Sequence, residues 1–365
     1  MRPNTQNATV TSPAGRPPSV SVLMAVYNCA VYLPAALDSI LGQTFSDFEL
    51  VVVDDASTDE TPVVLQACAQ RDRRLVVLRN ERNLKLAASL NRGLAVCRAP
   101  LVARADGDDL YHPGRLEKQW GFLEQHPGIG AVSCCFNRIS AEGKFLDFQK
   151  LPLEGGAIKF RMLWESSLNH AAVMYRQPIV REAGGYDENY ALAQDYDLWA
   201  RLMDRTEFAN LAEPLLTVRI HGASSSTVRC SEQSRLACGV SKRLLSRYLG
   251  KPPGDHEAAA LRTLLCAYEP VSADELSPAL KLLEELFCRA KERENAATLR
   301  WARREICASL LKQAYYRTYR DGAGSWQLLR KTAGVSALRV FLPAVSAQML
   351  RLLAARCRRE ALWVA

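Results

Sequence analysis

Short hydrophobic runs and helix-like repeats alternate along the first part of the chain. The runs at 20–26, 48–53, 75–78 and 101–103 are continuous and rich in valine and leucine, as in strands buried on both faces. Between them, apolar residues return every three or four positions, which predicts helices with one buried face. Four such strand–helix repeats predict an α/β fold with a Rossmann-like, mainly parallel sheet and flanking helices.

The pattern is less regular after the fourth repeat. It predicts, in chain order, a helix at 113–125, a strand at 129–134, a hairpin of 136–139 with 144–148, a helix at 157–164, a strand at 171–175, a helix at 195–203 and a strand at 215–220.

Near Cys230 the chain changes character. From there on it predicts long helices, at 274–290, 305–319 and 335–355, with a break at Lys251-Pro252-Pro253-Gly254. The first 18 residues are polar and rich in proline and threonine, which predicts a disordered tail. We therefore expect a tail at 1–18, a domain at 19–229 and a C-terminal α-helical region at 230–365.

Charge divides the chain at the same place. Of the 365 residues, 48% are hydrophobic and 24% charged, as in an ordinary globular protein, and the net charge is +8. From Cys230 onward, 23 basic and 13 acidic residues give +10, whereas the preceding part carries −2. The two regions are therefore expected to have different roles.

Cysteine usage and hydropathy bear on the compartment. The eleven cysteines contain no Cys-x-x-Cys pair, and several lie within apolar patterns. An odd, unclustered set is typical of free thiols in a reducing compartment. We find neither an apolar signal core at the start nor an uncharged apolar stretch of 18 residues. These features predict a cytoplasmic protein, with the inner face of the membrane as the alternative location.

Two acidic clusters follow predicted strands. Asp54 and Asp55 end the second strand, and Asp106, Asp108 and Asp109 follow the fourth. The carboxyl ends of parallel strands meet at one edge of a sheet, where ligands bind. Neighbouring carboxylates repel one another, and a divalent cation with oxygen ligands offsets that cost. A simple Asp-Gly turn is the structural alternative for the second cluster.

The order of these signals resembles glycosyltransferase family 2, the inverting enzymes of GT-A fold that use nucleotide-activated sugars. The resemblance covers Ser19 to Ser226 and rests on six stretches: VSVLMAVYN, QTFSDFELVVVDDASTDET, ADGDDLYHPGRLEKQ, GGYDENY, QDYDLWARL and VRIHGASSS. Together and in this order they imply an enzyme that takes a sugar from a nucleotide-sugar donor.

The resemblance also implies which residues hold the nucleotide. Ala25, Tyr27 and Asp55 match positions that hold the base, and because a carboxylate accepts the N–H of uracil, we expect a UDP-sugar. Packing is the alternative role for Tyr27. Asn83 and Lys85 match a stretch that usually reads Asn-x-Gly before a helix. Lys85, which replaces the glycine, either reaches the diphosphate or is a solvated helix start.

A metal site is implied at the second acidic cluster. Asp106 matches a residue facing the ribose or sugar, and Asp108 matches a ligand of Mg²⁺ or Mn²⁺ that bridges the donor phosphates. A cation there neutralises the charge that grows on the departing nucleoside diphosphate. His221, at the end of the last predicted strand, matches a position that completes the metal or diphosphate site. An ordinary structural or surface histidine is the alternative.

The acceptor side of the site is implied by two further positions. An inverting transfer needs one base to deprotonate the acceptor hydroxyl, and Asp195 matches that base, with Gln194 in place of the usual glutamate. A helix N-cap is the alternative role for Asp195. His170 lies in a region near the acceptor, which we expect to be a glycan or a lipid-linked glycan.

The last helical stretch has a separate interpretation. Residues 335–355 form an apolar stripe flanked by arginines, although Pro343 should kink it. We expect this helix to pack on its neighbours, and contact with an anionic membrane surface, as in a peripheral membrane protein, is the second interpretation. We found no motif for binding nucleic acid.

We therefore predict a metal-dependent, inverting glycosyltransferase that functions in the synthesis of cell-envelope polysaccharide. One alternative is a catalytically degenerate protein that binds nucleotide sugars or acts as a scaffold, because Lys85 and Gln194 depart from the family pattern. A nucleotidyltransferase is less favoured, since the turn after the first strand, Ala25 to Cys29, lacks a glycine-rich, basic phosphate loop.

Overall fold

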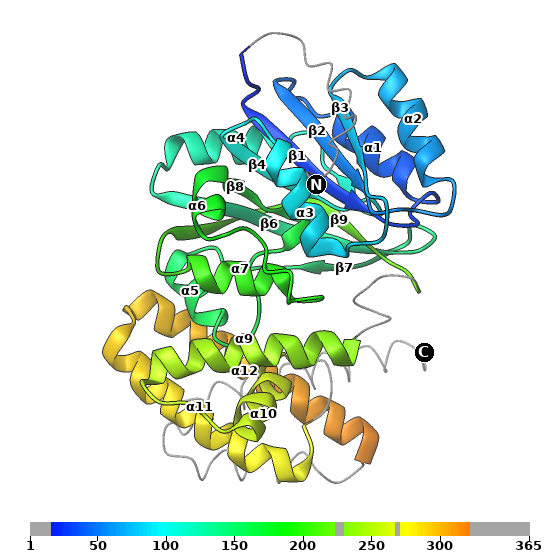
Figure 1. Ribbon diagram of the computed structural model, residues 1–365. Coiled ribbons are helices and arrows are strands. Elements are labelled where there is room, and N and C mark those ends of the chain that lie inside the picture. The colour runs from blue at the N-terminus through cyan, green and yellow to red at the C-terminus, as the bar shows by residue number, and fades with distance from the viewer. Residues whose placement is uncertain (1–15, 223–229, 267–270, 322–365) are drawn as a thin grey trace, which may run out of the picture. The chain divides into compact units, whose positions relative to one another are not determined.

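The computed structural model describes residues 16–222, 230–266 and 271–321 (Figure 1). The described chain forms two compact units. The first runs up to Ile158 and continues with Ser166–Leu236, and the second contains Lys159–Glu165 and the chain from Ala237 on. Most of the predicted tail at 1–18, and the whole predicted helix at 335–355, lie outside the described residues.

One sheet dominates the first unit. Its strands are β1 (Val20–Val26), β2 (Phe48–Asp54), β3 (Leu75–Arg79), β4 (Leu101–Ala105), β5 (Leu110–Tyr111), β6 (Ile129–Ser140), β7 (Phe145–Gln149), β8 (Met174–Arg176) and β9 (Glu207–Ile220). Within the described residues their order is β3-β2-β1-β4-β8-β6-β9-β5, and β7 pairs with β6.

The four strands at the start of this order are parallel, as the repeats predicted. In their register Val26 lies beside Asp54, and Met24 lies beside Ala105. The carboxyl ends of β1, β2 and β4 therefore meet at one edge, and both acidic clusters follow strands that end there. Beyond β4 the sheet is mixed, because β8 runs antiparallel to both β4 and β6. The α/β fold predicted from the sequence is confirmed.

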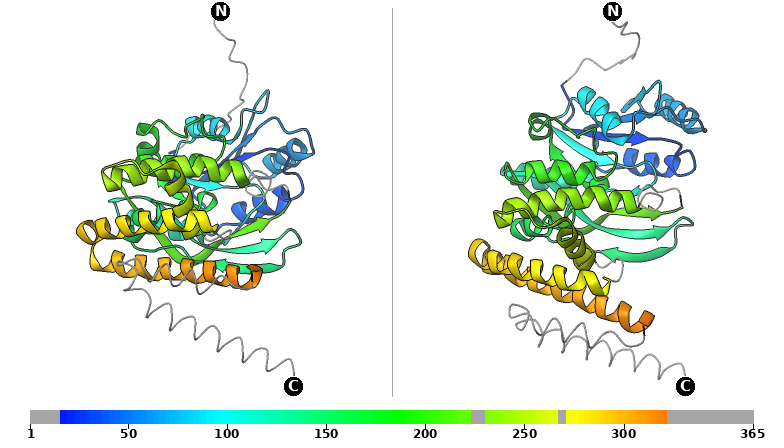
Figure 2. Two further views of the ribbon diagram at one scale, coloured as in Figure 1. Left: turned by 90° about the horizontal axis from the view of Figure 1, so that it is seen from below. Right: turned by 60° about the horizontal axis from the view of Figure 1, so that its bottom comes forward.

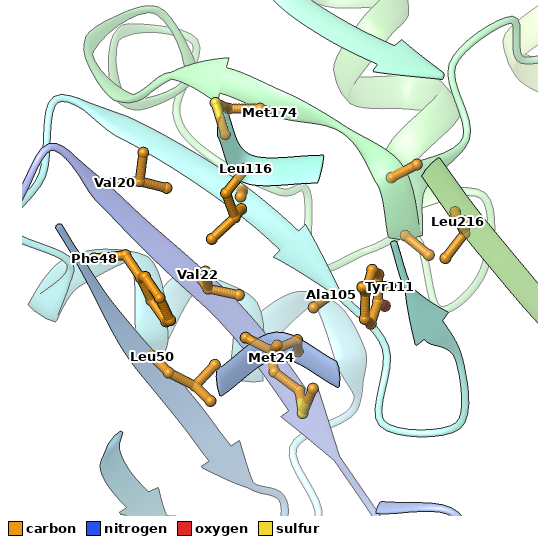
Figure 3. Packing of buried hydrophobic residues seen from close by; sticks show 14 of the residues in the cluster. Val20, Val22, Met24, Phe48, Leu50, Ala105, Tyr111, Leu116, Met174 and Leu216 are labelled. Atoms are coloured by element: carbon orange, nitrogen blue, oxygen red, sulfur yellow. The ribbon is translucent and has the colours of Figure 1, made fainter. Parts of the chain in front are cut away.

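Helices cover both faces of this sheet. They are α1 (Leu33–Leu41), α2 (Thr61–Arg71), α3 (Leu86–Val96), α4 (Arg115–Gln125), α6 (Gln177–Glu182) and α7 (Gln194–Leu202). Alternate residues of β1, such as Val22 and Met24, pack with Leu116 of α4 in one buried cluster (Figure 3). Leu23 points to the opposite face, where α3 lies so close that a Cβ on Gly93 would be 2.3 Å from the Leu23 Cδ1.

Two predicted strands differ from the observed ones. The strand expected at 171–175 is wrong in its first half, because His170–Ala172 form a 3₁₀ turn and β8 covers only Met174–Arg176. The Asn169 side chain causes this by accepting a hydrogen bond from the Ala171 N–H at 3.0 Å. The last strand begins at Glu207, earlier than predicted. Pro214 does not end the strand, because it lies where the pairing of β6 with β9 shifts register.

The second unit is helical. It contains α10 (Asp255–Cys266), α11 (Ala273–Arg293), α12 (Ala296–Asp321) and the part of α9 (Cys230–Leu249) from Ala237 on, and the end of α5 (Gly155–Arg161), from Lys159 on, also belongs to it. The helix predicted at 274–290 is confirmed, with Ser272 and Glu275 forming a capping box at its start. In both views of Figure 2, α11 and α12 lie side by side, and Arg303 stacks on the Phe287 ring at 5.6 Å. None of the helices in the described ranges has the length and apolarity needed to span a bilayer.

Candidate active site

The second acidic cluster forms a turn between β4 and β5. Asp109 is buried and accepts a hydrogen bond from the Arg219 N–H at 3.0 Å, which ties the turn to the end of β9. Gly107 allows the turn to lie against the end of β1, because a Cβ there would be 2.7 Å from the Val26 Cγ1. The glycine is thus required for close packing at this point.

His221 lies directly beside this turn. Its Nε2 is 3.0 Å from the Asp108 Oδ2, and its ring contacts the Tyr32 ring, with the centroids 4.7 Å apart. The Arg219 guanidinium lies 4.9 Å from the centre of the same Tyr32 ring and donates to the Asp108 carbonyl at 3.3 Å. The end of β9 therefore brings an imidazole and a guanidinium to the acidic turn. Arg219 was not among the residues predicted from the sequence.

The acidic turn concentrates negative charge. Burial, followed by repulsion from the Asp106 carboxylate, raises the pKa of Asp108. Burial and repulsion from Asp108 and Asp106 raise the pKa of Asp109 well above its usual range. A divalent cation beside these groups would relieve the repulsion and lower both values.

The donor set fits such a cation when a substrate completes it. The Asp108 carboxylate oxygen and the His221 imidazole nitrogen would supply two ligands. Within the described residues, His, Cys, Asp and Glu side chains form no cluster of three that could enclose a metal alone. A site with few protein ligands suits a metal that keeps water and substrate phosphates as its other ligands.

The first acidic cluster is organised by the chain that precedes α3. The Asp55 carboxylate is buried and accepts hydrogen bonds from the Asn80 side chain at 2.6 Å, the Leu84 N–H at 2.7 Å and the Lys85 N–H at 2.9 Å. Asn83 accepts a further hydrogen bond from the Lys85 N–H at 3.2 Å. Asp55 therefore fixes the loop that carries both Asn83 and Lys85.

Lys85 has an unusual backbone conformation. Its φ of 73° and ψ of 168° lie in a region that is populated almost only by glycine. This explains in physical terms why a glycine fits this position better. Its side chain is exposed, as is that of Tyr27, whereas Ala25 is half-buried at the end of β1. Strain of this kind gathers at functional sites.

Asp195 is the second residue of α7, and α7 lies on the face of the sheet opposite α1 and α4. Burial is the main cause that raises the pKa of Asp195, to about 6, and the nearby Arg104 guanidinium partly opposes it. The residue before α7's first turn, Ala193, has a left-handed conformation with φ of 59°. A carboxylate with a pKa near 6 is ionised at neutral pH and is a stronger base than an ordinary aspartate.

His170 is held in place by its neighbours. Its Nε2 lies 3.0 Å from the Tyr186 hydroxyl, and burial lowers the pKa of His170 well below its usual value. The Tyr186 backbone is held in turn by the Asn91 side chain, which donates to the Tyr186 carbonyl at 2.8 Å and accepts from its N–H at 2.9 Å. His170 is therefore a neutral imidazole in a fixed position.

Arg104 connects the two sides of the site, and the sequence did not predict it. It is fully buried on β4, and its Nη2 lies 2.5 Å from the Asp106 Oδ1. Its charge also acts on Asp195 and His170. Asp106, Asp195 and His170 are thus brought together around one cation, while Asp55 and Lys85 lie along the same sheet edge at the end of β2.

The chain is similar to known glycosyltransferases. The sequence model described as "Glycosyl transferase family 2" matches residues 21–182. An uncharacterized glycosyltransferase of Haemophilus influenzae is 30% identical over 243 residues, covering 64% of this chain and 75% of that protein. The O-antigen biosynthesis glycosyltransferase WbnJ of Escherichia coli is 30% identical over 210 residues, covering 56% of this chain and 81% of WbnJ.

Solved structures show the same fold at lower identity. Residues 1–349 of TarS of S. aureus, in complex with UDP-GlcNAc, superpose with a TM-score of 0.54 at 17% identity, covering 83% of this chain and 92% of that TarS chain. The mannosyltransferase PcManGT from Pyrobaculum calidifontis, in complex with GDP-Man and Mn²⁺, gives 0.51 at 16% identity, covering 95% and 91%.

The sheet, the acidic turn at the end of β4 and the match to relatives along most of their length agree with one another. The chain therefore belongs to glycosyltransferase family 2 and is a glycosyltransferase of GT-A fold.

Proposed function

We propose that this glycosyltransferase inverts the anomeric centre, uses a UDP-sugar and requires Mn²⁺ or Mg²⁺. The observation that carries the proposal is that the His221 Nε2 and the Asp108 Oδ2 lie 3.0 Å apart at the turn after β4, where Arg104 pairs with Asp106 and also acts on Asp195. Metal-ligand chemistry and a base of raised pKa at one edge are what a single displacement requires.

The nucleotide is assigned to the ends of β1 and β2. Ala25, Tyr27 and Asp55 would hold the base, and the fixed loop with Asn83 and Lys85 would lie beside it. Asp55 uses both oxygens to fix this loop. A carboxylate oxygen can accept more than one hydrogen bond, so Asp55 could also accept one from the base. A uracil N–H is the donor that a carboxylate at this position selects.

The diphosphate is assigned to the acidic turn. Asp108 and His221 would hold the cation, which when bound supplies positive charge to the leaving phosphates. Asp106, held by Arg104, would orient the ribose or the sugar. PcManGT, which has a similar fold, was solved in complex with Mn²⁺, and this supports a divalent cation here.

The transfer itself is assigned to Asp195. Its carboxylate takes the proton of an acceptor hydroxyl as that oxygen forms a bond to the anomeric carbon. The bond from the anomeric carbon to the phosphate oxygen breaks, and the electron pair leaves with the nucleoside diphosphate. The neutral His170 would lie on the acceptor side of the site, held by the buried Tyr186 hydroxyl.

The acceptor is assigned to a growing glycan or lipid-linked glycan of the cell envelope. WbnJ, which is named for O-antigen biosynthesis, supports this class of product. Nine of the cysteines in the described ranges are free thiols, which supports action on the cytoplasmic side of the membrane.

A donor panel tests the proposal. The purified chain is incubated with UDP-, GDP- and dTDP-sugars, with Mn²⁺, with Mg²⁺ and with a chelator, and release of the nucleoside diphosphate is measured. We expect release from one or more UDP-sugars that depends on the metal. Release that is unchanged by the chelator would contradict the metal assignment, and release from another nucleotide alone would contradict the base assignment.

A further inference from the structure

Arg104 is a buried charge in the middle of a strand. The neighbouring Ala103 and Ala105 of β4 belong to the apolar cluster on the face covered by α1 and α4. Because side chains alternate along a strand, Arg104 lies on the opposite face, beneath α7. Its side chain is 0% exposed, so it cannot touch a donor or an acceptor directly.

The position of Arg104 is fixed by its backbone as well as by its side chain. Its N–H donates to the Val173 carbonyl at 2.8 Å, and its carbonyl accepts from the Arg115 Nη2 at 2.7 Å. In its side chain, Nη2 donates to Asp106 and Nη1 to the Ala105 carbonyl, while the buried Nε has no hydrogen-bond partner. A guanidinium keeps its proton at any accessible pH, so its positive charge is permanent.

The groups around this charge come from several elements. Asp106 follows β4, Asp195 lies on α7, His170 lies in the 3₁₀ turn, and Tyr186 precedes α7. Arg104 acts electrostatically on all of them. Asp106 raises the pKa of Asp195 and Arg104 lowers it, whereas His170 and Tyr186 are uncharged near neutral pH.

We infer that Arg104 is a positioning residue, a buried cation shared by Asp106 and Asp195 that orients the first toward the donor and keeps the second ionised. This inference rests on the proposed role of Asp195 as the base. Arg104 thereby couples donor binding to the state of the base: without it, Asp106 loses its ion-pair partner and Asp195 loses the charge that favours its carboxylate form.

The test separates the charge of Arg104 from its contribution to packing. Arg104→Met and Arg104→Gln remove the charge, and Arg104→Lys retains it. Arg176→Met is a matched control, because the Arg176 guanidinium donates to the Ile129, Leu123 and His126 carbonyls and Arg176 pairs with Leu101 at the start of β4. The readouts are the acid limb of kcat/KM against pH, the UDP affinity, and thermal unfolding for each variant.

We expect the two neutral variants to shift the acid limb upward by about 1 pH unit and to weaken UDP binding by about 10-fold. Arg104→Lys should retain the acid limb of the parent, and Arg176→Met should lower the melting temperature without moving that limb. If Arg104→Met does not fold, Arg104→Gln decides. A folded neutral variant with the wild-type acid limb and UDP affinity would overturn the inference.

A second measurement does not depend on turnover. The stability of Asp195→Asn relative to the parent is followed by thermal unfolding from pH 4 to pH 9, with Arg104 present and with Arg104→Gln. The pH above which the difference stops changing reports the ionisation of Asp195 in the folded state. We expect removal of Arg104 to move it upward. An unchanged value overturns the inference, whereas absence of sugar transfer by the wild type contradicts only the proposed function.

Discussion

The Nε2 of His221 lies 3.0 Å from the Oδ2 of Asp108, although 113 positions separate the two residues in the chain. The contact joins the turn after β4 to the end of β9, and the Tyr32 ring packs against the imidazole. The nitrogen and the oxygen proposed as metal ligands are therefore held at the spacing of one hydrogen bond, which a shared cation would replace.

Substitution of His221 is predicted to weaken metal use without abolishing it. His221→Ala removes one of two proposed ligands, so the Mn²⁺ concentration for half-maximal activity should rise by about 10- to 100-fold. Saturating Mn²⁺ should largely restore turnover, whereas Asp108→Asn should not be rescued. The measurement is a titration of initial rate against free Mn²⁺.

The control for this experiment is His126→Ala. His126 is exposed at the end of α4 and stacks on Phe122. Its removal should leave the Mn²⁺ titration unchanged. An identical Mn²⁺ dependence in His221→Ala and the parent would show that His221 is not a ligand.

Removal of the proposed base should have opposite effects on rate and stability. Asp195→Asn cannot accept the acceptor proton, so we expect turnover to fall by about 10²- to 10⁴-fold while UDP binding is retained. In the parent, the rate should rise with pH through about 6, the pKa to which burial raises Asp195, and level off above it. In Asp195→Asn, the remaining rate should not show this rise with pH near 6.

The sign of the stability effect follows from the same shift. Below about pH 4, Asp195 is protonated in both the folded and the unfolded chain. Between about pH 4 and pH 6, Asp195 loses its proton in the unfolded chain but keeps it in the folded chain. The contribution of Asp195 to the free energy of unfolding therefore falls over this range and stays level above about pH 6. Asp195→Asn should thus be more stable than the parent above pH 6, by about 1–3 kcal/mol. If the difference in melting temperature between Asp195→Asn and the parent were the same at pH 5 and at pH 8, the raised pKa of Asp195 would be contradicted.

The acidic residues of the site could be predicted from the sequence, but the basic residues that pair with them could not. Asp55, Asp106 and Asp108 follow strands that periodicity identifies, and parallel strands must end at one edge, so their grouping could be predicted. Arg104 could not be found in this way, because a single arginine in an apolar run gives no sign of its partners. Only the packing of α7 and the 3₁₀ turn onto the sheet brings Asp195 and His170 to it.

Irregular elements were missed for local reasons. The start of β9 contains Asn210, Glu213 and Pro214, which break the apolar pattern, yet a shift in register accommodates the proline. The 3₁₀ turn at His170–Ala172 depends on one hydrogen bond, which the Asn169 side chain accepts from the Ala171 N–H and which competes with strand formation. Sequence reasoning relies on hydrophobic periodicity, and neither the register shift nor this hydrogen bond can be read from it.

Replacing Lys85 by glycine is predicted to stabilise the protein. The backbone of Lys85, with φ of 73° and ψ of 168°, costs about 1–3 kcal/mol for a residue with a Cβ. Glycine avoids this cost but gains about 0.4–1 kcal/mol of freedom in the unfolded chain. We therefore expect Lys85→Gly to raise the melting temperature by a few degrees.

Lys85→Ala is the matched comparison, because it removes the ammonium and keeps the strain. Its melting temperature should stay near that of the parent. If the ammonium binds the diphosphate, both variants should raise the donor KM by the same factor. A change of KM in Lys85→Gly alone would instead assign the effect to the backbone of the loop that Asp55 holds.

The last prediction concerns the space beneath the acidic turn. A Cβ at Gly107 would lie 2.7 Å from the Val26 Cγ1 and 3.1 Å from the Cys29 Sγ. The β-branched Val26 side chain sits at the end of β1 and has little freedom to move away. Gly107→Ala should therefore displace Asp106 and Asp108, lowering stability by about 1–3 kcal/mol and reducing kcat/KM more strongly than the melting temperature suggests.

A double-mutant cycle identifies the cause. Val26→Ala alone should cost about 1–2 kcal/mol by leaving space at the end of β1. Combined with Gly107→Ala it removes the clash, so the two changes together should cost less than their sum, and metal-dependent activity should partly return. Additive effects on stability and rate would mean that the turn can accept a Cβ without moving, and that the close contact with β1 does not position the acidic residues.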